Sequence, residues 1–225
     1  IGCVEPQKSG KTEGWHDAAF FNMCRPLELV FSNGMDKGVR IGPATGNVED
    51  MTTFEQFYDA YKKQMDYAIQ LLVNADNAID MAHAERCPLP FLSSMVDDCM
   101  KVGKTVQEGG AVYNFTGPQG FGVANMADSL YSVKTLVYDE KKITMGELKE
   151  ALATNYGKGL GAEDVAAMTA KIANELKEAG KTIGEKEVAA ILNTVVAASE
   201  APEVKANGER ILKLIEEVPK FGNDI

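Results

Sequence analysis

Apolar side chains recur every three or four positions along one long central segment. The series is Phe57, Ala60, Tyr61, Met65, Ala68, Leu72, Ala75 and Ile79. This spacing predicts an amphipathic helix that extends to about Ala84. Thr53 and Gln56 have the spacing of a capping box at its start, and Pro88 and Pro90 follow its end.

The segment before this helix has a different pattern. Residues Asp17–Phe31 are apolar almost all round, which predicts a buried helix that Pro26 kinks or breaks. Asn33 and Gly34 form a stop signal for that helix. Residues 34–50 are rich in glycine and turn residues, which is typical of a surface loop.

Shorter elements are predicted after the prolines. They are a helix over Leu92–Lys101 that stops at Gly103, a strand over Ala111–Phe115, a tight loop over Thr116–Gly120, a helix over Val123–Val137 and a helix over Thr144–Asn155 with Glu147 in its capping box.

The last third of the chain is rich in Ala, Lys and Glu between residues 158 and 208. Its periodicity predicts helices over 162–179, 185–199 and Pro202–Val218. The apolar face of the last helix consists of Ile211, Leu214, Ile215 and Val218. The expected fold class is therefore α/β and helix-dominated.

Composition and charge exclude several classes of protein. Apolar residues make up 45% of the 225 residues and charged residues 25%, as in globular domains. The net charge of −10 argues against a nucleic-acid partner. No apolar run reaches the roughly 20 residues of a membrane helix. Four cysteines without paired short spacing, and only two histidines, indicate neither a zinc site nor a disulfide framework, and favour a reducing cytoplasm.

Cys3 and Glu5 are the first candidates for chemistry. In an extended segment, positions i and i+2 project to the same face, which would bring this thiol and carboxylate together. A neighbouring negative charge raises the pKa of a thiol and so disfavours a nucleophilic thiolate. It allows a neutral thiol that gives and takes a hydrogen atom while Glu5 moves protons. The alternative is a small apolar residue beside a surface acid.

Two further motifs are candidates for a site. In Trp15-His16-Asp17, the aspartate either caps the helix expected after it or serves a site. Residues Tyr113–Gly122 carry three glycines and one proline, which favours a shaped structural or substrate-lining loop. A phosphate-binding loop is less favoured, because the motif lacks the lysine and the glycine spacing of such loops.

In their order along the chain, these segments resemble the glycyl radical enzyme family, whose founder is pyruvate formate-lyase. The matching stretches are Gly2–Pro6, Lys11–Asp17, Pro88–Phe91, Tyr113–Gly122, Val137–Lys142 and Pro219–Asp224. The resemblance covers residues 1–157 and 209–225. It implies that these residues belong to the family's ten-stranded catalytic barrel, that residues 158–208 are a helical insertion, and that the chain is an internal fragment.

The resemblance implies roles for three residues. Cys3 matches the cysteine from which a glycyl radical draws a hydrogen atom, and Glu5 matches the general base of the eliminating members. Asp17 matches an aspartate that holds a substrate hydroxyl in diol dehydratases. No bound cofactor or metal is expected. The radical would lie on a glycine outside this chain, installed by an activating enzyme that uses S-adenosylmethionine and an iron–sulfur cluster. The intact enzyme is expected to be a cytoplasmic homodimer from an anaerobe that acts on a small molecule.

Val4 distinguishes the chain from pyruvate formate-lyase, which has a second cysteine at this position. This difference argues against acyl transfer and favours elimination, with diol dehydration slightly ahead of carbon–sulfur cleavage of isethionate. The family's Arg-Val-Ser/Ala-Gly-Tyr radical loop does not occur in these 225 residues, so the chain by itself is expected to be inactive. A non-catalytic helical interaction module and a conventional cysteine hydrolase are the competing hypotheses.

Overall fold

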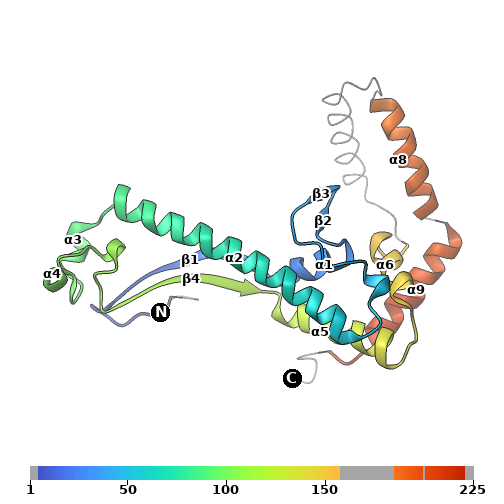
Figure 1. Ribbon diagram of the computed structural model, residues 1–225, viewed down its shortest axis with the longest axis horizontal. Coiled ribbons are helices and arrows are strands. Elements are labelled where there is room, and N and C mark those ends of the chain that lie inside the picture. The colour runs from blue at the N-terminus through green and yellow to red at the C-terminus, as the bar shows by residue number, and fades with distance from the viewer. Residues whose placement is uncertain (1–4, 158–184, 200, 221–225) are drawn as a thin grey trace. The chain divides into compact units, whose positions relative to one another are not determined.

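A computed structural model describes residues 5–157, 185–199 and 201–220 of the protein (Figure 1). The chain divides into two compact units. We call residues 1–29 and 61–126 the strand-pair unit, and residues 30–60 and 127–225 the helical unit. The helix predicted over 162–179 lies outside the described residues. None of the helices in the described ranges is long and apolar enough to cross a membrane.

Two parallel strands form the centre of the strand-pair unit. Strand β1 (Thr12–Asn22) pairs with β4 (Tyr113–Phe121), and the two run side by side in Figure 1. The helix predicted to begin at Asp17 is therefore wrong as far as Asn22, because those residues are strand. An uninterrupted apolar run is compatible with a helix or with a strand. Here the backbone N–H and C=O groups of β4 provide the hydrogen-bond partners that favour the strand.

Helix α1 (Arg25–Phe31) is the part of that predicted helix that forms. Pro26 lies in its first turn, where the absence of an N–H costs nothing, so it starts the helix rather than kinking it. The predicted stop is confirmed, since Asn33 and Gly34 both have positive φ angles, of 53° and 78°.

The tight loop predicted over Thr116–Gly120 is also wrong. These residues continue β4, which extends the predicted strand by six residues beyond Phe115. Glycine and proline weaken a strand in isolation, but they are tolerated where another backbone approaches closely or where the ladder is interrupted. In β4 both conditions are met, because β1 is the backbone that approaches and the ladder is interrupted opposite Pro118.

Helix α2 (Phe54–Arg86) confirms the long helix. Its capping box is present: the backbone N–H of Gln56 donates to Thr53 Oγ1, and the N–H of Thr53 donates to Gln56 Oε1, each over 3.3 Å. From Tyr61 onward the helix lies along β1 and β4 (Figure 1).

The helix predicted over Leu92–Lys101 is broken into α3 (Pro90–Ser93) and α4 (Cys99–Val102). Asp98, with φ of 74°, separates them, and Gly103 ends α4 as predicted. A small apolar core formed by Val96, Cys99, Val106 and Ala111 holds this segment together with the 3-10 turn η2 (Val106–Glu108). A backbone hydrogen bond from Asp97 to Gly10 connects it to the residues before β1, and one from Tyr113 to Lys11 joins the starts of the two strands.

The helical unit contains a short hairpin and a series of helices. The hairpin joins β2 (Met35–Asp36) to β3 (Val39–Arg40) within the segment predicted as a loop, and the 3-10 turn η1 (Val48–Asp50) follows. The helices are α5 (Val123–Val133), which begins in the strand-pair unit, the π-helical turn η3 (Lys134–Asp139), α6 (Met145–Ala153), α8 (Glu185–Ser199) and α9 (Pro202–Glu217). These positions agree with the sequence predictions.

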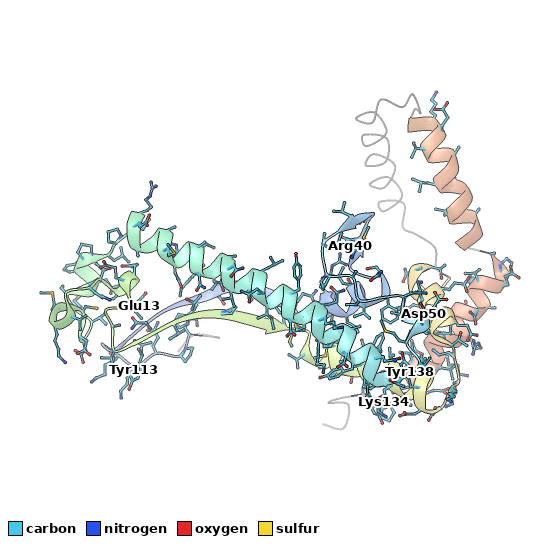
Figure 2. All side chains as sticks on the ribbon, viewed as in Figure 1. Glu13, Arg40, Asp50, Tyr113, Lys134 and Tyr138 are labelled. Carbon is cyan, nitrogen blue, oxygen red and sulfur yellow. The ribbon has the colours of Figure 1, made fainter. Side chains whose placement is uncertain are left out.

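An aromatic cluster packs the start of α2 against η3. The ring of Tyr138 meets the rings of Phe54 and Phe57, and its hydroxyl donates to the carbonyl of Met51 over 3.2 Å. Burial raises the pKa of Tyr138 to about 12. Figure 2 labels Tyr138 near the start of α2.

Helices α6 and α9 are joined by packing and by charge. Ile211 of α9 is fully buried, and Arg210 forms an ion pair with Glu147 of α6 at 2.8 Å. Glu147 also completes the predicted capping box by accepting the N–H of Thr144 over 2.7 Å. The hydrogen bonds from Thr144 lower the pKa of the Glu147 carboxyl below its ordinary value.

Replacing Thr144 by alanine should destabilise α6 locally. The change removes the side-chain oxygen that accepts the N–H of Glu147, a loss that typically costs about 1 kcal/mol at an N-cap. Amide hydrogen exchange in the first turn of α6 should accelerate accordingly. Thr144→Ser keeps the hydroxyl and should exchange like the wild type. Equal exchange in both variants would contradict a stabilising role of this cap.

Candidate functional site

The strand-pair unit contains a cavity of about 670 Å³ between its strands, α2 and the segment around η2. Two of the three predicted site residues, Glu5 and Asp17, line it. Glu13 and Asp80 bring two more carboxyl groups to the same cavity. Figure 2 labels Glu13 and Tyr113 toward the end of the strand pair nearest α3 and α4. Cys3 lies outside the described residues, so its expected position beside Glu5 stays a prediction.

Asp17 is carried by an interruption in the strand pair. His16 pairs with Gly117, and the next paired residues are Phe20 and Gln119, so Asp17, Ala18 and Ala19 lie opposite Pro118 alone. Proline has no N–H to donate to the ladder, which is the physical reason for a break at this position. Asp17 has a left-handed φ of 55°, a conformation that aspartate adopts more readily than most residues.

Asp17 belongs to β1 and, like the four strand residues before it, lines the cavity. It is the first residue beyond the regular part of the ladder, in a β-bulge. Asp17 therefore does not cap a helix, which is one of the two roles considered from the sequence. Because a helix was predicted from Asp17 onward, the interrupted strand pair was not predicted from the sequence. Pro118 was the available signal, since proline cannot donate to a strand ladder.

His16 lies in an aromatic and partly apolar environment. Its ring meets the edge of Phe115 with centroids 4.8 Å apart, and its Nε2 atom is buried without a hydrogen-bond partner among the described residues. Phe115 is possible in this position because Gly14 lies opposite it: a Cβ on Gly14 would approach the ring to 2.3 Å. Burial raises the pKa of the Glu13 carboxyl, and the nearby His16 partly offsets this shift.

Helix α2 contacts the strands one residue pair before the bulge, at Trp15 and Thr116. Thr116 Oγ1 donates a hydrogen bond to Asp80 Oδ2 over 2.5 Å. Trp15, which pairs with Thr116, meets the His83 ring edge-on with centroids 5.3 Å apart. Sequence reasoning missed both helix residues. Their i, i+3 spacing on one face of α2 was the available signal, because it places two polar side chains beside the predicted strand.

No group of three metal-ligating side chains is assembled anywhere in the described part of the chain. The glycines of Tyr113–Gly122 do not form a phosphate loop, since the residues through Phe121 belong to β4. Gly117 and Gly120 instead lie in the strand ladder opposite β1. The cavity thus offers carboxyl groups, imidazoles and hydrogen-bonding amides, which bind hydroxyl groups and transfer protons.

The pyruvate formate lyase-like family matches residues 1–225, and the chain belongs to it; its relatives are glycyl radical enzymes. The whole chain superimposes with a TM-score of 0.90 and 58% identity on a solved structure described as 1,2-propanediol dehydration in Roseburia inulinivorans, covering 27% of that chain. The matched solved structures are glycyl radical enzyme barrels, of which this chain covers a part. This confirms the family and the fragment of its fold that the motifs predicted.

Two curated relatives represent different reactions. The chain is 39% identical over 158 residues to (2S)-3-sulfopropanediol dehydratase of Klebsiella oxytoca, covering 69% of this chain and 19% of that protein. It is 30% identical over 175 residues to isethionate sulfite-lyase of Desulfovibrio desulfuricans, covering 74% and 20%. The chain thus spans about a fifth of the length of these relatives.

Gly14→Ala should loosen the strand pair next to the site. The added methyl group must displace the Phe115 ring from its contact with His16, and such overpacking typically costs about 1–3 kcal/mol. The local free energy of opening, measured from amide hydrogen exchange in β1 of the full-length protein, should fall by this amount.

Gly117→Ala is the matched control on the partner strand. A Cβ there comes no closer than 3.4 Å to any atom, which is ordinary contact, and φ is not in the left-handed region. Its exchange should stay near that of the wild type. If the two substitutions were equally mild, the close approach of Gly14 to Phe115 would not be a constraint on the strand pair.

Proposed function

We propose that this chain is the part of a glycyl radical lyase that carries the hydrogen-transferring cysteine, Cys3, and that the enzyme dehydrates a small polyol. The observation that carries the proposal is that Glu5 and Asp17, the two described residues of the predicted site, line one cavity. The family membership and the similarity to dehydratases support the same reaction.

In this proposal the radical supplied by a glycine elsewhere in the enzyme removes the hydrogen atom from the Cys3 thiol. The Cys3 sulfur then takes a hydrogen atom from a substrate carbon that bears a hydroxyl group. Glu5 accepts the proton of that hydroxyl as the carbon–oxygen bond at the neighbouring carbon breaks. The departing hydroxide receives a proton from Glu5 and leaves as water. Cys3 returns its hydrogen atom to the neighbouring carbon, which leaves an aldehyde as product.

Asp17 orients the substrate in this scheme by accepting a hydrogen bond from a hydroxyl. A carboxylate is a strong hydrogen-bond acceptor. If Asp17 holds one hydroxyl in a fixed position, it determines which carbon of the substrate faces Cys3. Enclosing such a site also protects the radical, because water and oxygen would consume a reactive intermediate.

Charge supports a polyol over isethionate as substrate. The described residues that line the cavity include four carboxyl groups and neither lysine nor arginine. A neutral polyol can donate hydrogen bonds to carboxylates, whereas a sulfonate would be repelled unless other parts of the enzyme supplied cations. The lower identity to the isethionate sulfite-lyase agrees with this preference.

The proposal includes the rest of the family's machinery. We expect a ten-stranded barrel, an activating enzyme that uses S-adenosylmethionine and an iron–sulfur cluster, and a homodimer. A cytoplasmic location is expected because a reducing compartment keeps the Cys3 thiol free. The division into barrel residues 1–157 and 209–225 and a helical insertion over 158–208 stays a prediction.

Cys3→Ala should abolish turnover of the full-length enzyme with propane-1,2-diol or glycerol after activation without oxygen, because no other group in the proposal transfers the hydrogen atom. Activity should fall to the background of the unactivated enzyme, while the glycyl radical signal in electron paramagnetic resonance should persist. Full turnover in this variant would refute the assignment of Cys3. Isethionate, assayed in parallel with the wild type by sulfite release, tests the alternative substrate.

Glu5→Gln should lower kcat without preventing radical formation. The amide has the shape of the carboxylate but cannot accept the proton, and loss of a general base typically costs about 10²–10⁴-fold. Steady-state kinetics at matched radical content measures the effect. Glu28→Gln, an exposed acid of α1 that pairs with Arg25, is the control and should retain wild-type kcat. A Glu5→Gln enzyme with unchanged kcat would exclude Glu5 as the base.

A further inference from the structure

We propose that Asp80 is a positioning residue: by holding Thr116, it fixes the register of the strand pair one residue pair before the bulge and so keeps Asp17 in its position at the cavity. The functional part of this inference rests on the proposed function, in which Asp17 holds a substrate hydroxyl. Its structural part does not depend on that proposal.

The contacts concentrate on one pair of residues. Thr116 and Trp15 are register partners in β4 and β1, and each is held from the same side by α2. Asp80 accepts the hydrogen bond of the Thr116 hydroxyl over 2.5 Å, and His83 meets the Trp15 ring at 5.3 Å. Because positions 80 and 83 are neighbours on one helix face, a single turn of α2 holds both strands.

The contact of α2 with Trp15 and Thr116 matters because it lies next to the interruption in the strand ladder. One residue pair beyond it, His16 and Gly117, the ladder is interrupted, because Pro118 lies opposite Asp17, Ala18 and Ala19, and it resumes at Phe20 and Gln119. An interrupted ladder is held less firmly in register, and a slip of one residue turns every following side chain to the other face. The contacts of α2 with Trp15 and Thr116 keep the unpaired residues Asp17, Ala18 and Ala19 opposite Pro118.

The chemistry of the anchor suits this role. A hydroxyl that donates to a carboxylate makes a charge-assisted bond, which is shorter and stronger than one between neutral groups. The bond is partly buried, which protects it from competition by water. Asp80 itself lines the cavity, and the role assigned to it here is the one that its Oδ2 atom has as acceptor of the Thr116 hydroxyl.

The first test uses steady-state kinetics of the full-length enzyme, activated without oxygen, with propane-1,2-diol as substrate. Asp80→Ala should raise KM by about tenfold or more, since small misplacements of a positioning group are costly, while the radical content stays at the wild-type level. Asp80→Asn should restore KM to within about twofold, because its amide oxygen still accepts the Thr116 hydroxyl. Asn77→Ala, an exposed change on the same helix, is the matched control and should leave KM unchanged.

The partner residue provides an independent variant that changes the fold less. Thr116→Val keeps the β-branched shape but cannot donate, so it should reproduce the Asp80→Ala effect, and Thr116→Ser should not. In an Asp17→Ala background, Asp80→Ala should cause no further rise in KM, because the residue it positions is absent. A merely structural role would lower activity in both backgrounds alike.

Amide hydrogen exchange tests the register itself without any assay of turnover. In Thr116→Val, exchange should accelerate between Ala18 and Phe21, beyond the anchor, while the strand start around Glu13 stays protected. The inference is overturned if this exchange is unchanged, or if Asp80→Ala and Thr116→Val keep wild-type KM in an active enzyme. A wild type that does not dehydrate the diol, with exchange altered as expected, would refute the proposed function and leave the positioning role supported.

Discussion

The parallel pairing of β1 with β4 is the interaction on which the rest of the strand-pair unit depends. The two strands are separated by 90 residues of sequence, and residues of α2 and of the segment around η2 line one cavity with them. Parallel strands need such a crossover connection, and here the crossover carries side chains that complete the cavity wall. The site is therefore a product of the pairing rather than of any one segment.

The irregularity in this ladder matters as much as the ladder. Residues 13–17 of β1 all line the cavity, and the last of them, Asp17, is the first residue beyond the regular ladder. At this break opposite Pro118, Asp17 has a left-handed φ of 55°. Bulges beside active sites are a general means of redirecting a side chain, and this one is determined by a residue that cannot donate to the ladder.

Carboxyl groups dominate the chemistry that the described residues can perform. Burial raises the pKa of the Glu13 carboxyl, while the imidazole of His16 acts in the opposite direction. Carboxylates that line a cavity accept hydrogen bonds, which favours ligands that donate them. A polyol is such a ligand, and a nearby proton-accepting carboxylate is what an elimination from a hydroxylated carbon requires.

The sequence by itself determined the long helix α2, the helices after Gly122 in the described residues, two of their caps and the identity of the family. Thr53 and Thr144 begin their helices as predicted because a capping box is a local arrangement, complete within four residues. The order of short motifs around Cys3, Asp17 and Tyr113–Gly122 was equally sufficient to indicate the family.

Only the tertiary structure decided that residues 17–22 and 116–120 are strands. Their apolar run and their glycines favoured a helix and a loop when each was taken alone, and only the facing strand supplies the hydrogen-bond partners that reverse the choice. The same dependence explains Asp80 and His83, which are ordinary helix-surface residues in the sequence. A contact between segments far apart in the chain depends on the pairing register, and no local pattern encodes a register.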